Sequence, residues 1–91
     1  ITSVVDENGR VVGVITDGDL RRLLEKEPDI FSLKAGDVMN KNPKIIDKDS
    51  LAVKAANKME KYGITALIVV DDQKRPIGIV HLHDLMRQRV V

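Results

Sequence analysis

Valine-rich runs interrupted by a short polar segment occur twice along the chain, and each has the pattern of a β-hairpin. The first run covers residues 4–15 around a polar segment at 6–10, and the second covers residues 69–80 around a polar segment at 71–75. Short stretches rich in β-branched residues and joined by a few polar residues are typical of paired strands. The pattern therefore predicts two antiparallel hairpins.

Details of the two hairpins support this interpretation. Asn8 and Gly9 favour a tight turn, because both residue types tolerate positive φ. Pro76 opens a return strand at a position that needs no amide donor. Each hairpin leads into a helical pattern, at residues 18–26, ending before Pro28, and at residues 82–89. The leucines of these helices are expected in the core: Leu20, Leu23, Leu24 and Leu85.

The two hairpin–helix segments form an internal repeat. Residues 4–22 pair without a gap with residues 69–87, and eight positions are identical. Most other positions exchange residues of similar type. The identical positions are Val4/Val69, Val5/Val70, Asp6/Asp71, Arg10/Arg75, Gly13/Gly78, Asp19/Asp84, Leu20/Leu85 and Arg22/Arg87.

The segment between the copies predicts a strand at 44–46 and a helix after it. Asp49 and Ser50 are good N-caps, and Gly63 suits a helix C-terminus. One helical stripe holds Leu51, Ala52, Ala55, Ala56 and Met59. From residue 38 the order is strand, helix, strand, strand, helix, an α+β unit. The first copy has only the last three elements, so the repeat predicts a strand and a helix, roughly 25 residues, before Ile1.

Composition excludes several classes of protein. The chain has 91 residues, 43% of them apolar and 32% charged, which is typical of a small globular domain. A net charge of +1 and two aromatic residues argue against nucleic-acid binding. The absence of cysteine excludes disulfides and Cys-based zinc sites. No apolar run is long enough for a membrane span, and no signal peptide is visible, so we expect a cytoplasmic protein.

The first strand-to-helix corner, Thr16-Asp17-Gly18-Asp19, has the chemistry of a phosphate and sugar site. A helix N-terminus offers unpaired N–H groups to an anion, and Gly18 allows close approach. Thr16 offers a hydroxyl, and Asp19 can accept hydrogen bonds from a ribose diol. The structural alternative is that Asp17 or Asp19 caps the helix. Both roles can coexist if Asp17 provides the cap.

The second corner keeps Asp84 but has His81 at the threonine position and His83 at the Gly18 position. His81 can donate a hydrogen bond to a phosphate or carboxylate. His83 is expected at the surface or as a cap. A His-x-His metal site is the least favoured alternative, because no third ligand is evident. We therefore expect an altered ligand site at this corner and no metal.

These segments resemble a known module. VMNKNPKII, the capped helix, GITALIVVDDQKRPIGIV and the closing Asp-Leu are similar to the CBS domain, named after cystathionine beta-synthase. ITDGDLRRLLEKEPDI, together with HLHDLMRQRVV at the end, resembles the C-terminal CBS pair of D-arabinose 5-phosphate isomerases. The resemblance implies residues 1–36 as the end of one module and residues 37–91 as a second. In that family a sugar isomerase (SIS) domain precedes the pair and carries out catalysis, so this segment is not itself expected to be an enzyme.

The resemblance also implies a function: binding a nucleotide effector in the cleft between modules and regulating the isomerase. In CBS modules Gly-h-h-Ser/Thr-x-x-Asp, where h is apolar, holds the ribose and phosphate. The expected ligand residues are Thr2, Ser3, Thr16, Gly18, Asp19, Lys44, Ile45, Thr65, Ala66, His81 and Asp84. Core packing is the alternative for Ala66, and surface charge is the alternative for Lys44.

CMP-Kdo, a nucleotide carrying a sugar acid, is the favoured effector, because the family supplies arabinose 5-phosphate for Kdo and lipopolysaccharide biosynthesis. AMP or ATP is the rival ligand, either here or in another parent protein. No cofactor is expected. The resemblance further implies a homodimer formed through the CBS modules. A purely structural module that assembles the enzyme and binds nothing is the alternative function.

Overall fold

The computed structural model describes residues 1–26 and 29–89. It divides into two compact units, Ile1–Pro43 and Lys44–Val91. Residues 37–43 lie with the first unit, where Asn40 and Val14 exchange two backbone hydrogen bonds of 2.8 and 3.2 Å. The module division at residues 36 and 37 stays a prediction about the repeat.

The first unit contains the predicted hairpin and helix. β1 (Thr2–Val5) pairs antiparallel with β2 (Val11–Ile15), and α1 (Asp17–Lys26) follows directly. A short 3₁₀ helix, η1 (Ile30–Ser32), and α2 (Ala35–Val38) complete the unit. The expected helix stop at Pro28 lies outside the described residues.

The second unit has the predicted order of strand, helix, strand, strand, helix. Its elements are β3 (Ile45–Asp47), α3 (Ala52–Tyr62), β4 (Ala66–Val70), β5 (Pro76–His81) and α4 (Leu82–Arg87). β4 is the central strand, parallel to β3 and antiparallel to β5. The α+β class is therefore confirmed. Within the described ranges no helix has both the length and the apolar character needed to cross a membrane.

Both hairpins close through an aspartate at the start of the turn. The Asp6 carboxylate accepts hydrogen bonds from the backbone N–H groups of Asn8 and Arg10, at 2.8 and 3.0 Å. Asp71 makes the equivalent two bonds in the second hairpin, both at 2.9 Å. Only Gly9 takes positive φ in the first turn, so the expectation for Asn8 is wrong. The aspartate organises a longer turn, in which one left-handed residue suffices.

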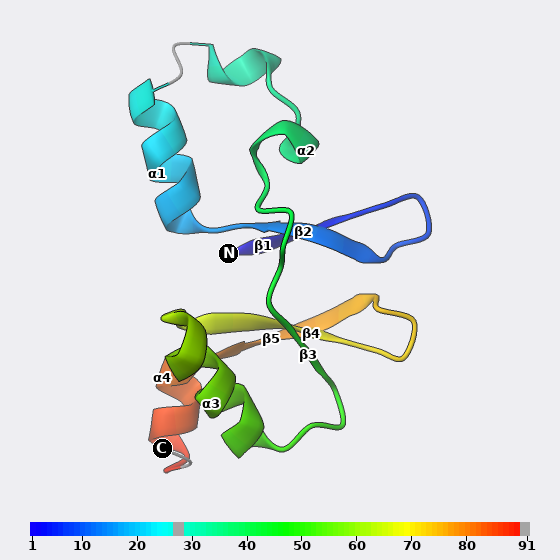
Figure 1. Cartoon of the computed structure of the whole chain (residues 1–91), viewed down its shortest axis with the longest axis vertical. Helices are drawn as coiled ribbons and strands as arrows, with labels where there is room; N and C mark the ends of the chain where they lie inside the picture. The colour runs from blue at the N-terminus through cyan, green and yellow to red at the C-terminus, as the bar shows by residue number, and fades with distance from the viewer. Residues whose placement is uncertain (27–28, 90–91) are drawn as a thin grey trace. The chain divides into compact units, whose positions relative to one another are not determined.

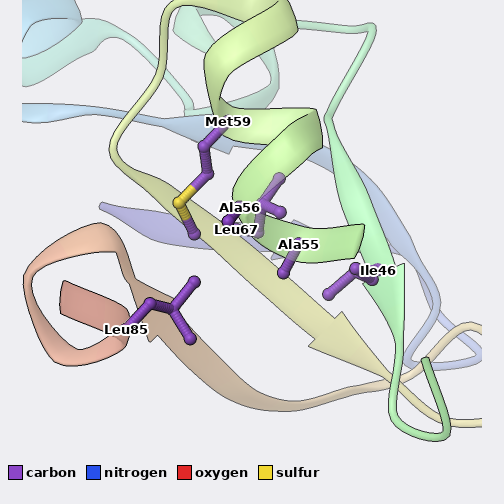
Figure 2. Close-up of a cluster of buried hydrophobic side chains, with 6 residues drawn as sticks. All are labelled: Ile46, Ala55, Ala56, Met59, Leu67 and Leu85. Atoms are coloured by element: carbon purple, nitrogen blue, oxygen red, sulfur yellow. The ribbon is translucent and has the colours of Figure 1, made fainter. Parts of the chain in front are cut away.

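The core of the second unit forms where α3 and α4 pack on the sheet, and Figure 1 shows both helices beside β3, β4 and β5. In Figure 2 the small side chains of α3 face β4, and Met59 and Leu85 point toward the same space. Ala55 and Ala56 let α3 approach β4 closely. The buried cluster is Ile46, Ala55, Ala56, Met59, Leu67 and Leu85.

The start of α3 differs from the prediction. Leu51 is the N-cap, and no side chain caps it. Asp47 turns the chain instead, because its carbonyl and carboxylate oxygens accept hydrogen bonds from the backbone N–H groups of Ser50 and Asp49. Asp49 and Ser50 therefore lie within this turn, and neither is the N-cap of α3. Leu51, 74% exposed, and the exposed Ala52 are wrong as members of the buried stripe.

The C-terminal end of α4, which begins at Leu82 as predicted, and the burial of two leucines of α1 also differ from the prediction. α4 ends at Arg87, because Arg89 takes a left-handed φ of 60°. Leu20 and Leu24 are 45% and 60% exposed, whereas Leu85 is 6% exposed. The difference follows from packing: α3 lies against α4, and the described part of the first unit contains no helix packed on α1 in this way.

The repeated glycines Gly13 and Gly78 provide a matched test of the packing. A Cβ at Gly13 would overlap the Met39 side chain and would lie 3.0 Å from the carbonyl oxygen of Asn40, whereas a Cβ at Gly78 would meet only Val69, at 4.0 Å. We expect Gly13→Ala to lower the free energy of unfolding by about 1–3 kcal/mol, the usual effect of overpacking. Gly78→Ala should change it by less than about 0.5 kcal/mol. Urea unfolding followed by circular dichroism measures both, and equal losses would contradict the close approach at Gly13.

Candidate nucleotide-binding corners

The first corner is a reciprocal helix cap. The backbone N–H of Asp19 donates to Thr16 Oγ1 at 3.1 Å, and the backbone N–H of Thr16 donates to Asp19 Oδ2 at 3.0 Å. This is the capping-box arrangement, in which two side chains satisfy each other's backbone donors. Thr16 and Asp19 are therefore brought together as expected, and they also have a structural role.

Asp19 is held further by Arg22, one helical turn later. Arg22 Nη2 donates to Asp19 Oδ1 at 2.6 Å, and the Asp19 side chain is 28% exposed. The hydrogen bond from the Thr16 backbone, with added bonds from the Thr16 and Arg22 side chains, holds the pKa of Asp19 below its usual value of 3.8, although partial burial opposes this. The carboxylate is thus charged and positioned at neutral pH.

Of the two aspartates considered as caps, Asp19 forms the capping bond and Asp17 does not. The Asp17 side chain is 94% exposed, and the capping bonds come from Thr16 and Asp19. A cap by Asp17 therefore does not free Thr16 and Asp19 for a ligand. Gly18 lies in the first turn, where a Cβ would sit 3.4 Å from Arg22 Nη1.

The second corner has no such reciprocal cap. His81 is the N-cap of α4 and makes no side-chain capping bond. The first amide of the helix, that of Leu82, donates instead to the Thr65 carbonyl at 2.8 Å. The Asp84 carboxylate lies 4.0 Å from Arg87, and both side chains are more than half exposed. The corner therefore presents an imidazole and a carboxylate that are not used to close the helix.

The expected ligand residues of the second unit lie at one end of its sheet. β3 and β4 run parallel, so Ile45 and Ala66 begin neighbouring strands. β5 runs the other way, and its last residue, His81, pairs with Ala66. Lys44 and Thr65 immediately precede the two strand starts, and Asp84 is in the first turn of α4. These residues therefore lie at the same end of the sheet, although Ile45 pairs with Ile68, so β3 begins two residues farther along β4 than Ala66.

The first unit shows the same arrangement in its hairpin. Thr2 pairs with Ile15 and Ser3 pairs with Val14, so the start of β1 lies beside the end of β2. Thr16 follows β2 at once. Thr2 is exposed and Ser3 is half-buried. A ligand contact by any of these residues stays a prediction.

Sequence reasoning missed Tyr62 at this end of the second unit. Lys44 Nζ lies 4.3 Å from the centre of the Tyr62 ring. The two residues are far apart in the sequence and meet only because α3 returns the chain to the start of β3. By contrast, the Asp19–Arg22 pair was available from its helical i, i+3 spacing.

Two other features adjoin these elements. Asp47, Asp49 and Asp72 place oxygen atoms within 4.8 Å of one another, but all three are exposed, and exposed acidic groups alone do not define a metal site. A mainly apolar groove of about 460 Å³ opens at the C-terminal half of α3 and beside α4. Its lining comprises Ala56, Met59, Glu60, Gly63, Ile64, Thr65, Leu82 and Met86.

A family model described as the CBS domain matches residues 2–26 and 35–90. The chain therefore belongs to the CBS domain family. The CBS pair of protein MJ0100, solved in complex with 5′-methylthioadenosine and S-adenosyl-L-methionine, is 33% identical with a TM-score of 0.81, covering 97% of this chain and 68% of that chain. CBSX2, solved in complex with AMP, is 27% identical with a TM-score of 0.77, covering 97% and 69%.

Curated relatives are arabinose 5-phosphate isomerases. KdsD of Francisella tularensis is 47% identical over 85 residues, which is 93% of this chain and 26% of that protein. KdsD of Pseudomonas aeruginosa is 41% identical over the whole chain and 28% of that protein. The chain thus spans about a quarter of the length of these relatives.

The reciprocal cap predicts how the free energy of unfolding depends on pH in the acid range. The folded-state pKa of Asp19 is depressed, so its ionised form contributes stability above the ordinary pKa of 3.8, and this contribution is lost as the pH falls through the lower folded value. The free energy of unfolding of the unmodified chain should fall as the pH drops below about 4. In Asp19→Asn we expect this fall to be smaller, because the titrating carboxylate is absent. Asp6 and Asp71, whose pKa values are also lowered by turn hydrogen bonds, remain in this variant.

Asp84→Asn is the matched control, because the Asp84 carboxylate accepts no backbone hydrogen bond among the described residues.

Thr16→Ala removes the other half of the cap. It should lower the free energy of unfolding by about 1 kcal/mol at neutral pH, the usual value of an N-cap. Urea unfolding at a series of pH values separates these effects. Identical acid profiles for Asp19→Asn and Asp84→Asn would rule out the cap as the cause.

Proposed function

We propose that the chain is a regulatory CBS pair that senses a ribonucleotide effector at its strand-to-helix corners. The observation that carries this proposal is the gathering of polar groups around each corner: Thr2, Ser3, Thr16 and Asp19 in one unit, and Lys44, Thr65, His81 and Asp84 in the other. Hydroxyl, carboxylate and cationic groups suit a ribose diol and an attached anion. AMP in the CBSX2 structure supports this class of effector, and the two ligands of the MJ0100 structure share its adenosine part without the phosphate.

The parent protein is proposed to be a cytoplasmic D-arabinose 5-phosphate isomerase of Kdo and lipopolysaccharide biosynthesis. Its catalytic SIS domain is the expected partner of this segment, which is proposed to have no catalytic role. Support comes from the 47% and 41% identity to KdsD proteins. An effector that binds one conformation more tightly shifts the population toward it, which is sufficient for regulation.

CMP-Kdo remains the favoured effector, and AMP or ATP is the alternative. A pathway end product of this kind contains a ribose phosphate and a sugar acid, and each of these groups suits the chemistry of one of the corners. In this proposal the chemistry of Asp19 suits a ribose at the first corner, and the chemistry of His81 suits a carboxylate at the second corner. The adenosine-type ligands of the solved relatives favour the alternative.

Binding is best tested at Asp84, because changing it leaves the reciprocal cap of α1 intact. Calorimetric titration with CMP-Kdo, CMP, AMP, ADP and ATP should identify a ligand. Asp84→Ala should then weaken binding by about 1.5–3 kcal/mol, as for a hydrogen bond to a charged group. Asp19→Ala should weaken it by a similar amount, with an additional fall in melting temperature from the lost cap.

The result for Asp19 separates its two roles. A lower melting temperature with unchanged nucleotide affinity would leave Asp19 as a cap alone. Failure of all five nucleotides to bind the unmodified protein would contradict the proposed function.

A second candidate function, assembly of the parent enzyme, is favoured by the apolar groove beside α3 and α4. Met86 lines this groove and is 56% exposed. Association of two copies as a homodimer through these helices would remove that apolar surface from water, which is favourable. This function does not exclude nucleotide sensing.

Met86→Glu tests this association. Placing a charge in the groove should shift a dimer toward monomer, because burying an unpaired carboxylate is costly. Light scattering at high micromolar concentration measures the mass, and Arg87→Glu, on the same helix but outside the groove lining, is the control. A monomeric unmodified chain would contradict the proposed assembly.

A further inference from the structure

Tyr62 connects two elements at the candidate ligand end of the second unit. It is the last residue of α3, and the residue is 43% exposed. The half-buried Lys44, directly before β3, places its ammonium 4.3 Å from the ring centre. Lys61, the sequence neighbour of Tyr62, lies farther away at 5.4 Å. A cation within about 6 Å of an aromatic face is attracted to it.

Lys44 and Lys58 differ in the groups that their ammonium groups contact. Lys58 Nζ donates to the Ile45 carbonyl at 2.5 Å, so its ammonium is used to hold α3 to the edge strand β3. For Lys44, no carboxylate of residues 1–26 or 29–89 lies within ion-pair distance of its ammonium. The ring occupies one face of the ammonium, and an ammonium has three donors. Lys44 therefore keeps donor capacity for an anion.

We propose that Tyr62 is a positioning residue, whose ring holds Lys44 beside the starts of β3 and β4 so that its ammonium meets the phosphate of a bound nucleotide. This inference rests on the proposed nucleotide function and assigns a role within that site. A free lysine side chain loses considerable conformational entropy when it is fixed by a ligand. The ring restricts the Lys44 side chain before the ligand binds, so less conformational entropy is lost on binding.

The consequence is a phosphate-specific effect on affinity. Removing the ring leaves the cation in place but unrestrained, so nucleotides should bind more weakly, whereas nucleosides, which lack the phosphate, should not change. A structural role for Tyr62 would instead weaken both ligands together. The ratio of nucleotide to nucleoside affinity is therefore the informative quantity.

The experiment is calorimetry on the whole chain with AMP and adenosine, and with CMP and cytidine. In Tyr62→Leu we expect AMP or CMP to bind about two- to five-fold more weakly, the range of an exposed cation–π contact, with nucleoside affinity unchanged. Tyr62→Phe keeps the ring and should restore the ratio. Lys61→Met removes the other lysine near the ring and should leave the ratio unchanged.

A double variant completes the test. Lys44→Met should lower the ratio by itself, and adding Tyr62→Leu should lower it no further, because the two residues act as one unit. An unchanged ratio in Tyr62→Leu, with nucleotides bound normally by the unmodified chain, would overturn the role of Tyr62 alone. Failure of the unmodified chain to bind any probe would overturn the proposed function, and this inference would fall with it.

Discussion

The first turn of a helix has backbone N–H groups with no partner inside the helix, and this constraint organises both halves of the molecule. The first unit satisfies it with side chains, through the Thr16–Asp19 reciprocal cap. The second unit uses a backbone carbonyl, that of Thr65, directly before β4. The choice decides which polar groups remain available to a ligand. At the first corner they are already engaged, and at the second they are open.

The two copies of the repeat therefore share their backbone geometry more closely than they share the hydrogen-bonding roles of matching side chains. Both hairpins close through an aspartate that accepts two backbone hydrogen bonds. The left-handed position that Gly9 occupies in one turn is held by Lys74 in the other, at a φ of 63°. A lysine there is strained, since side chains disfavour this region. The turn tolerates it because the aspartate and the paired strands determine the backbone path.

Sequence patterns predicted what depends on local spacing. The hairpins, the order of elements and the buried stripe through Ala55, Ala56 and Met59 follow from periodicity and are confirmed. Leu51 was misplaced because Asp47 forms its own turn and delays the helix start. Burial of Leu20 depends on which helix packs on α1, a tertiary property that a periodic pattern cannot express. The Lys44–Tyr62 contact is of the same kind, since it depends on how α3 lies against β3.

The difference between the corners bears on how a regulatory ligand would act. A ligand that uses Asp19 competes with the Thr16 amide and Arg22 for the same carboxylate, so binding there must be coupled to the stability of α1. A ligand that uses Asp84 meets a carboxylate with only a distant arginine and leaves the start of α4 unchanged. Coupling between binding and structure is what a sensor requires, because a ligand shifts an equilibrium only through contacts that differ between states. By this reasoning the first corner is better suited to transmit a signal, and the second to contribute affinity.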